Sequence, residues 1–551
     1  MLPIIRREFV AILRTRRAAI IQWLLAVCYT AIIVVRWPSD ARADLSGANS
    51  QNVFGLFAYG LLAVVVLMTP IFPATSIVME RRTGTLALLL NSPLKTPAIY
   101  LGKLLGVLGF VVLMIAISLP SAAACYAMGG VDLQDQLVTL YGLLLVVAVQ
   151  YVAVGLLVSS YAASADSAVR LTYGCVLGLS LITLGPYFLF QSDPGLVSST
   201  VAWVRCLSPI PAVMQIAGQG DIGSLEKMQG WSALGRYVVL AMVSSLGMSM
   251  WTVYRLHFRC MDRSRSQGMV TDDKSLGIRA IRRVAFLVDP SRRSGSIGNW
   301  SNPVMIKEFR SRRFGRSHWM IRLVMVCAVL SLLIAFSVTA GTVRLELEAV
   351  GGPLVMLQVG LLVMFLPSLA AGLISSERES GAWPLLRSTP LSGGAIVRGK
   401  LLSVFWTMLL LIASTIPGYL VMLYIQPTVW VQVAQGFVCL ILAGLLALMI
   451  SATAGSIFRR TAAATTAAYI CVLTLFGGSL LVWLARDAPF GFKTVENVLI
   501  LNPMAAALSV FRIPGFAAYH LLPYSWYVSA ALIVAMYFAM RLQVQRLTRP
   551  E

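Results

Sequence analysis

Charged residues are scarce in this chain of 551 residues. Asp, Glu, Lys and Arg together make up 12% of it, whereas apolar residues make up 58%. Soluble globular domains carry roughly a quarter of charged residues. No segment outside the apolar runs is long or mixed enough to build a core of its own. The composition therefore excludes an ordinary soluble protein and predicts an all-α polytopic membrane protein.

Acidic residues are especially few, with 22 Asp and Glu against 44 Lys and Arg. A basic nucleic-acid-binding protein would place these charges on one face of a folded module. Here about 34 of the 44 lie in the termini and in alternate loops, at 1–17, 80–103, 161–170, 255–316, 376–400, 459–460 and 541–549. Cytoplasmic loops of membrane proteins carry such an excess. The distribution argues against a nucleic-acid partner and predicts that both termini are cytoplasmic.

Residues that carry chemistry are also sparse. The three histidines are isolated, none of the eight cysteines forms CxxC, and no HExxH or Ser-His-Asp arrangement occurs. The sequence thus indicates no disulfide framework, no metal site and no catalytic residue. Ion-coupled transporters usually keep acidic residues inside their spans. Here Asp and Glu fall almost wholly in loops, which weakens the hypothesis of a secondary transporter.

The apolar runs predict about twelve transmembrane helices, since a bilayer-spanning helix needs about 20 apolar residues. Six are expected near 18–36, 53–79, 99–124, 136–160, 168–190 and 233–256, and six near 318–340, 351–375, 398–424, 432–456, 464–485 and 523–542. The loops at 191–232 and 486–522 hold apolar pieces too short to span, which we interpret as re-entrant or interfacial. Each contains a polar-Pro pair, Ser208-Pro209 or Asn502-Pro503.

Two segments, here named the first and second cassettes, are alike. They read ERRTGTLALLLNSPLKTPAIYLGK (80–103) and ERESGAWPLLRSTPLSGGAIVRGK (377–400). They align without a gap at a spacing of 297 residues and agree at 11 of 24 positions. A spacing this long corresponds to a structural half and not to a solenoid repeat. We therefore predict two homologous, parallel six-helix halves.

Each predicted half opens with a short basic stretch that contains Glu-Phe. In 4–17 and 304–316, Glu8 matches Glu308 and Arg16 matches Arg316. We expect two amphipathic helices on the inner membrane surface, with the arginines towards the headgroups. The predicted organisation is a first six-span half at 1–256, a cytoplasmic linker at 257–300 and a second half at 301–551.

Each cassette begins where an apolar span ends in Glu-Arg. Gly84 and Gly381 follow and suit the positive φ of a helix C-terminal turn. The pairs Ser92-Pro93 and Thr389-Pro390 predict the start of the next helix, because a hydroxyl N-cap followed by proline is a start signal. An ordinary polar hairpin is the alternative interpretation. An ordinary connector, however, has no reason to be repeated or to expose apolar residues, which usually mark a partner surface. The leucines concerned are Leu88, Leu89, Leu385 and Leu386.

The pattern E-R-x-x-G-x-x-x-L-L-x-x-x-P-L…A-I-x-x-G-K resembles the loop between the second and third spans of type-2 ABC transporter permeases, bacterial exporters of the ABC-2 kind. The stretch NPVMIKEFRSRR (302–313) resembles the amphipathic helix that opens such permeases. The resemblance covers both halves. It implies a permease of the bacterial cytoplasmic membrane, driven by separate cytoplasmic ABC ATPase subunits in two copies.

By this resemblance the chain is an exporter subunit and not an enzyme. It binds no cofactor, whereas ATP and magnesium bind to the partner ATPase. The cassettes would be coupling helices that dock on the ATPase. The second carries Trp383-Pro384 where the first has Leu86-Ala87, which puts the equivalence of the two docking sites in doubt. The docking residues are Glu80, Arg81, Gly84, Leu88, Leu89, Pro93, Leu94, Lys103, Glu377, Arg378, Gly381, Leu385, Leu386, Pro390, Leu391 and Lys400.

Two motifs in the second cassette imitate nucleotide-binding sequences. Gly394 to Lys400 has the P-loop spacing GxxxxGK, but Leu401 follows where the motif needs Ser or Thr, and no strand is expected before it. Residues 391–394 (LSGG) imitate an ABC ATPase signature without a nucleotide-binding domain around it. We interpret both as accidental. The alternatives to a permease are an ion-gradient-driven secondary transporter, a membrane-embedded enzyme with lipid substrates, and a membrane anchor. The spans carry no polar cluster that identifies a substrate.

Overall fold

The computed structural model describes residues 2–14, 19–30 except 20, 21 and 24, 48–181 except 163, 183, 196–218, 232–258, 302–311, 324–332, 347–484 and 491–548. Within these ranges all regular secondary structure is helical. The first helices are α1 (Leu2–Leu13), α3 (Ala48–Met68), α4 (Ile71–Thr83), α5 (Thr85–Leu90), α6 (Thr96–Ala116), α7 (Leu119–Ala127), α8 (Thr139–Tyr161), α9 (Ala165–Leu181), α11 (Leu196–Arg205), α12 (Ile210–Ile216) and α14 (Ala233–Phe258).

The later helices follow the same succession. They are α16 (Pro303–Ser311), α18 (Leu347–Ala370), α19 (Gly372–Glu379), α20 (Trp383–Arg387), α21 (Gly393–Ala413), α22 (Ile416–Ile425), α23 (Trp430–Ile457), α24 (Thr461–Leu484), α25 (Phe492–Ile500), α26 (Pro503–Val510) and α27 (Tyr524–Thr548). A π-helical turn, η1 (Leu133–Val138), precedes α8, and a 3₁₀ turn, η6 (Pro427–Val429), precedes α23.

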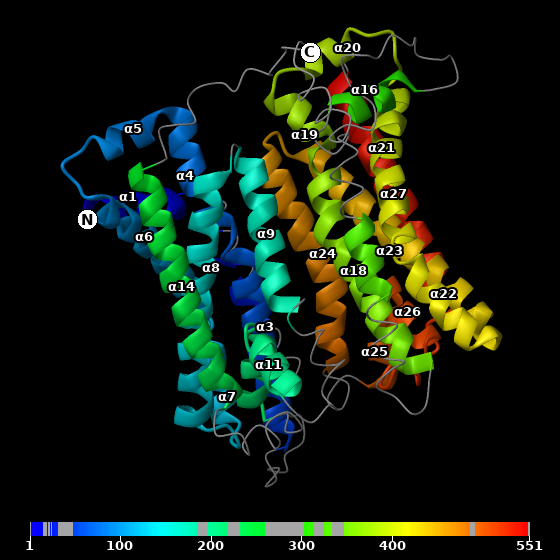
Figure 1. Ribbon diagram of the computed structural model, residues 1–551, viewed down its shortest axis with the longest axis horizontal. Helices are drawn as coiled ribbons and strands as arrows, with labels where there is room; N and C mark the ends of the chain where they lie inside the picture. The colour runs from blue at the N-terminus through cyan, green and yellow to red at the C-terminus, as the bar shows by residue number, and fades with distance from the viewer. Residues whose placement is uncertain are drawn as a thin grey trace. The chain divides into compact units, whose positions relative to one another are not determined.

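The chain forms two compact units. The first comprises Met1–Ser264 and Leu480–Val495, and the second comprises Arg265–Ser479 and Glu496–Glu551. In the first unit, α1 and α5 lie at the end opposite α7 and α11 (Figure 1). In the second, α16, α19 and α20 lie at the end opposite α22 and α26 (Figure 1). Each cassette therefore lies at the same end of its unit as the amphipathic helix.

Nine helical segments among the described residues are long and apolar enough to cross a membrane. They are Val53–Thr83, Thr96–Ala127, Leu133–Tyr161, Ala233–Phe258, Gly351–Glu379, Gly393–Ile425, Pro427–Ile457, Thr461–Trp483 and Tyr524–Leu547. They confirm nine of the predicted spans. The other three, near 18–36, 168–190 and 318–340, lie wholly or partly outside the described residues, so the count of twelve stays a prediction. The linker at 257–300 lies almost wholly outside them too.

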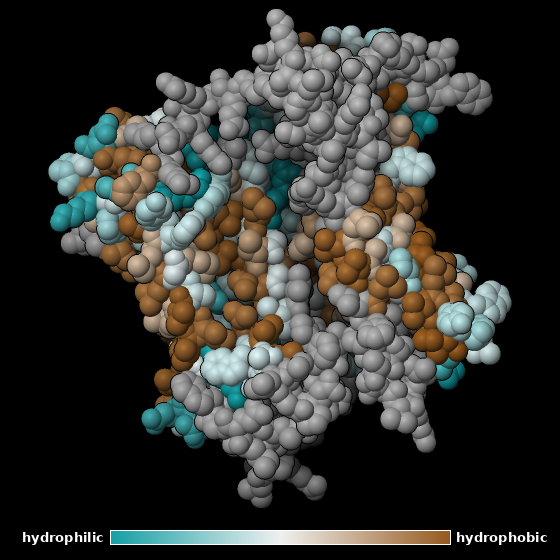
Figure 2. Space-filling model, in the orientation of Figure 1, coloured by the Kyte–Doolittle hydropathy of each residue, from teal (hydrophilic) through white to brown (hydrophobic). Residues whose placement is uncertain are grey.

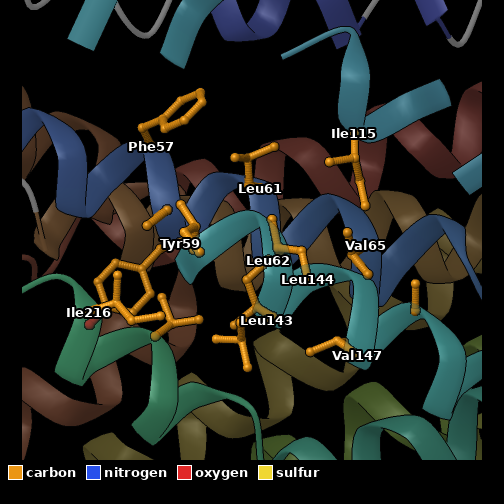
Figure 3. Close-up of a cluster of buried hydrophobic side chains, with 14 of the residues drawn as sticks. Phe57, Tyr59, Leu61, Leu62, Val65, Ile115, Leu143, Leu144, Val147 and Ile216 are labelled. Atoms are coloured by element: carbon orange, nitrogen blue, oxygen red, sulfur yellow. The ribbon is translucent and has the colours of Figure 1, made fainter. Parts of the chain in front are cut away.

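Apolar side chains fill the interior of the first unit between α3, α6 and α8. Leu62 of α3 lies beside Leu144 of α8, whereas Phe57 and Leu61 extend from the opposite side of α3, and all four are buried (Figure 3). A helix that is apolar on every side suits a membrane, because it can bury one face in protein and turn the other to lipid. On the face shown in Figure 2, apolar side chains cover the middle of each unit and polar ones lie towards its ends.

The two polar-Pro pairs tie short helices to the preceding span. Ser208, between α11 and α12, donates its hydroxyl to the Ser180 carbonyl at 2.8 Å. Asn502, between α25 and α26, donates its side-chain amide to the Phe476 carbonyl at 3.0 Å and caps α26 by accepting from the Met504 amide at 2.9 Å. The apolar pieces of both loops are thus helix–turn–helix elements. Their re-entrant or interfacial placement stays a prediction.

The predicted helix start at the Ser-Pro and Thr-Pro pairs is wrong. The helices begin later, at Thr96 in α6 and at Gly393 in α21. Instead of capping a following helix, the Ser92 hydroxyl donates to the Leu89 carbonyl at 2.6 Å. Thr389 donates to Leu386 at the same distance. Both hydroxyls therefore satisfy carbonyls at the end of the short cassette helix, which a sequence pattern does not distinguish from an N-cap.

Candidate functional site: the cassettes and their ion clusters

Each cassette folds as a short helix after a left-handed turn. Gly84 ends α4 with φ 76°, and Gly381 follows α19 with φ 74°. Since a residue with a Cβ is strained in this region, the turn requires glycine at both places. The prediction from the sequence is confirmed here. The turn brings α5 and α20 out of line with the spans that precede them (Figure 1).

One leucine of each cassette points into solvent. Leu88 is 73% exposed and Leu385, its counterpart 297 residues later, is 72% exposed. Leu89 is only half-buried, whereas Leu386 is buried. The expectation that all four leucines are exposed is therefore wrong for Leu386. A five- or six-residue helix can expose only part of its circumference, so the leucine pair splits between the two faces.

The opposite face of each short helix packs inside its own unit. Leu86 is buried in a cluster that includes Leu256 of α14. Its counterpart Trp383 is also buried, and its indole Nε1 donates to the Leu547 carbonyl of α27 at 3.3 Å. The substitution of Leu by Trp between the cassettes thus lies on the inner face. It anchors the helix to the last span of the unit and leaves the exposed leucine unchanged.

A buried lysine lies at the centre of the first cassette. The Lys103 ammonium on α6 is 1% exposed and lies 3.0 Å from Glu8 Oε1 of α1 and 2.8 Å from Glu80 Oε2 of α4. It also donates to the Ser76 hydroxyl at 3.1 Å. Arg7 completes the cluster by pairing with both carboxylates, at 2.9 Å for Glu8. We call these four charged residues the first ion cluster.

The first ion cluster is electrically neutral, with two carboxylates and two cations. Burial alone would raise the pKa of Glu8, but Lys103 and Arg7 hold it below its usual range. Burial would likewise lower the pKa of Arg7, and the two carboxylates raise it instead. Charges are costly to bury unless they are paired and hydrogen-bonded. The cluster meets that condition by joining α1, α4 and α6.

The second unit repeats this arrangement. The Lys400 ammonium of α21 is 1% exposed and lies 2.6 Å from Glu308 Oε1 of α16 and 3.3 Å from Glu377 Oε1 of α19. Lys307 pairs with Glu377 at 3.0 Å. These four residues form the second ion cluster. The sequence predicts Glu8 and Glu308 as matching residues of two surface helices. In the structure they also match in their contacts, because each pairs with a buried lysine.

The arginine of each Glu-Arg pair also turns inward. Arg81 donates to the carbonyls of Ser160, at 3.3 Å, and Ala162, and Arg378 donates to the Ser456 carbonyl at 3.1 Å. These carbonyls lie at the C-terminal ends of α8 and α23, where helices leave carbonyls unsatisfied and favour cations. The two arginines thus connect each cassette to its fourth predicted span.

Glycine lets the amphipathic helix approach the third predicted span closely. A Cβ added at Gly106 would lie 2.7 Å from the Glu8 Cβ, and one at Gly102 would lie 2.9 Å from Ile4 Cγ2. In the second unit a Cβ at Gly399 would lie 2.5 Å from Asn302 Oδ1. The Asn302 amide donates to the Ala395 carbonyl at 3.0 Å. The Gly-Lys dipeptide of the cassette pattern therefore combines close contact at the glycine with an ion pair at the lysine.

The structure brings together most, but not all, of the residues that the sequence singled out. Pro93 and Pro390 are exposed, and Leu94 and Leu391 are half-buried near the short helices. Arg16 and Arg316 lie outside the described residues. Sequence reasoning missed Arg7, Lys307 and Glu379. Glu379, which stands where the first cassette has Arg82, accepts from the Thr461 amide at 2.8 Å and hydroxyl at 2.6 Å, and so caps α24.

The first cassette and the apolar helices around it lie within a segment that a sequence comparison identifies. Residues 30–248 match the profile of the family described as ABC-2 family transporter protein. This part of the chain belongs to the ABC-2 transporter family. Together with the nine candidate spans, the match makes the chain a multi-pass membrane protein and a transmembrane component of an ABC transporter. No curated protein and no solved structure is detectably similar to it.

The match of residues 30–248 to the ABC-2 family implies association with ABC ATPase subunits. The P-loop imitation of the second cassette has no strand before it in the described residues, since Gly394 to Lys400 lies inside α21. The lysine of this imitation, Lys400, pairs with Glu308 and Glu377. Among the described residues, no group of three or more His, Cys, Asp or Glu is placed to hold a metal ion.

Proposed function

We propose that the chain is the permease of an ATP-driven exporter and that both cassettes dock on separate cytoplasmic ATPase subunits. In this proposal the cassette ends of both units face the cytoplasm of a bacterium, as do both termini. The direction of transport rests on the family resemblance, and the orientation rests on the distribution of Lys and Arg. The chain itself neither binds nor hydrolyses ATP.

One observation supports the docking role above all: Leu88 and Leu385 are exposed to nearly the same extent on short helices that the buried Leu86 and Trp383 anchor to their units. An isolated exposed leucine needs no explanation. A leucine held twice in the same place, at the end of the unit that the charge distribution assigns to the cytoplasm, is typical of a partner contact. A partner groove that buries this side chain would gain about 1.5–3 kcal/mol per leucine.

The likeness of the two exposed faces supports two copies of one ATPase. Thr83, Asn91 and Pro93 around Leu88 correspond to Ser380, Ser388 and Pro390 around Leu385, and all six are exposed. The faces differ in charge, because Arg82 and Lys95 of the first cassette are replaced by Glu379 and Ser392. We propose that ATP binding draws the two ATPase copies together and that each cassette transmits this movement to its own unit.

The test is purification of the tagged protein in mild detergent, followed by assay of ATP hydrolysis and sequencing of any co-purified chain. The account predicts a co-purified chain with a Walker A motif and vanadate-sensitive hydrolysis. Leu88→Asp with Leu385→Asp should abolish both, whereas the matched Leu88→Met with Leu385→Met should retain both. Proton-gradient-driven transport in vesicles without ATP would instead favour a secondary transporter. Partner binding without any flux would favour an anchor.

A further inference from the structure

Each ion cluster joins three helices of its unit through charged side chains. In the first unit, Glu8 belongs to α1, Glu80 to the end of α4 and Lys103 to the start of α6. The short helix α5 lies between the last two along the chain. The position of Leu88 on α5 therefore depends on the end of α4 and the start of α6, which Lys103 holds together. It also depends on α1, because Lys103 pairs with Glu8.

Close packing and buried charge restrict independent movement of α1, α4 and α6. Gly102 and Gly106 bring α6 against Ile4 and Glu8 of α1 without space for a Cβ. Lys103 is 1% exposed and its carboxylate partners are largely buried, so water screens these two ion pairs much less than a surface pair. Separating Lys103 from both carboxylates would leave its buried charge uncompensated and leave Arg7 as the one cation of the cluster that still pairs with Glu8 and Glu80. The ion pairs thus resist relative motion of α1, α4 and α6 more strongly than a surface pair would.

In the second unit, a buried ion pair also fixes the amphipathic helix, but the contacts that support the lysine differ. Lys400 and Glu308 are both almost fully buried and 2.6 Å apart. Leu373 stands at the position that corresponds to Ser76, so the second lysine lacks the hydroxyl contact of the first. Asn302 adds a hydrogen bond from the start of α16 to α21. The ion pairs are common to both units, whereas the supporting contacts are not.

We propose that Lys103 and Lys400 are positioning residues that make each amphipathic helix a moving part of the docking element. Each lysine fixes α1 or α16 to the cassette, so that a displacement of Leu88 or Leu385 by the ATPase carries the amphipathic helix with it. The amphipathic helix then moves relative to the membrane surface and does not act as a passive anchor. This inference rests on the proposed docking of the cassettes.

The test measures the distance between spin labels at Val10→Cys on α1 and Thr85→Cys on α5, both exposed positions of the first unit. The eight native cysteines are replaced by alanine, and the complex with its ATPase is measured without nucleotide and with ATP and vanadate. We expect one narrow distance distribution that is the same in both states, because the labelled helices move together. The Lys493→Met control should behave identically, since Lys493 of α25 is exposed and outside both the ion cluster and the cassette.

Lys103→Met should give a distribution that broadens or shifts when ATP and vanadate are added. If Lys103 had only a structural role, Lys103→Met would lower the thermal stability without this nucleotide-dependent change in distance. If Lys103→Met does not fold, the quadruple variant Arg7→Met, Glu8→Gln, Glu80→Gln, Lys103→Met removes the ion pairs without leaving an unpaired charge of the cluster. The proposal is overturned if the folded variant keeps the parent distribution in both states, or if the parent distribution itself changes.

The two proposals can fail separately. If no ATPase co-purifies with the parent protein, the proposed function fails. The nucleotide-free distributions of the parent and of Lys103→Met still show whether the lysine holds α1 against the cassette. If the ATPase binds and the labelled helices move apart in the parent, docking stands and the positioning role is wrong.

Discussion

Lys400 and Glu308 form a 2.6 Å ion pair in which both side chains are almost fully buried. Glu308 lies on the amphipathic helix and Lys400 on the helix that follows the cassette. Lys103 and Glu8 repeat this relationship at 3.0 Å in the first unit. Three separate similarities in the sequence, Glu-Phe, Glu-Arg and Gly-Lys, therefore have a common physical cause, which is one neutral ion cluster per unit.

Removal of the second buried lysine should destabilise the protein strongly. Lys400→Met leaves Glu308 and Glu377 without their shared cation, and breaking a buried pair from one side costs about 3–5 kcal/mol. Unfolding in detergent should show this loss. The control is Lys307→Met: Lys307 pairs with the same Glu377, but its side chain is 47% exposed. An exposed pair is worth about 0–1 kcal/mol. Equal losses for the two variants would contradict the assignment of Lys400 as the centre of the cluster.

Addition of one methyl group at Gly106 should displace α1. The new Cβ would lie 2.7 Å from the Glu8 Cβ, so one helix must shift. Overpacking of this kind costs about 1–3 kcal/mol. Gly142→Ala in α8 is the matched control, because a Cβ there meets no atom within 4 Å. That control should be neutral or stabilising, since alanine favours a helix by up to about 1 kcal/mol over glycine. Proteolysis of the N-terminal segment should increase only in Gly106→Ala.

Acid should weaken the first ion cluster. The pKa of Glu8 is lower in the folded protein than its usual value of 4.5. The charge of Glu8 therefore stabilises the fold fully above about pH 4.5, and this contribution is lost as the pH falls through the lower folded value. The difference in thermal midpoint between the parent and Glu8→Gln should be constant from pH 7 to pH 5 and shrink below. A difference that grew on acidification would show that the carboxylate is not held by Lys103 and Arg7.

Single substitutions of the exposed leucines should change the stoichiometry of the complex. If each cassette binds one ATPase copy, Leu88→Asp or Leu385→Asp alone should leave one copy per chain, and the double variant should leave none. Loss of one hot-spot side chain costs about 2 kcal/mol or more of binding free energy, which raises the dissociation constant roughly thirtyfold. Native mass spectrometry of the detergent complex gives the copy number. Two copies retained by the double variant would show that docking occurs elsewhere.

Much of this fold follows from short-range patterns in the sequence. Long apolar runs predicted nine helices that the structure confirms, and Gly84 and Gly381 predicted the left-handed turns. These features depend on local chemistry. Ser92 and Thr389 do not cap the following helix as predicted. A hydroxyl before proline can donate to a carbonyl earlier in the chain as well as accept from an amide later in the chain.

The candidate site was harder to predict because it is made by distant residues. The pairing of Glu8 with Lys103 joins residues 95 apart in the sequence, and no local pattern shows which cation meets which carboxylate. Charges that both cassettes repeat at a span boundary suggest a docking surface equally well. The structure separates these residues by burial. Lys103 and Lys400 are buried, Glu80 and Glu377 are partly buried, and Leu88 and Leu385 lie at the surface.

The most direct test of the docking account is site-specific photocrosslinking in native membranes. A photoreactive amino acid is placed at Leu88, at Leu385 and, as a control, at Tyr424, which is 89% exposed at the opposite end of the second unit. The account predicts that the first two positions, and not Tyr424, crosslink to an ATP-binding chain with a Walker A motif. A chain of that kind captured from Tyr424, or captured from neither leucine position while it co-purifies, would contradict it.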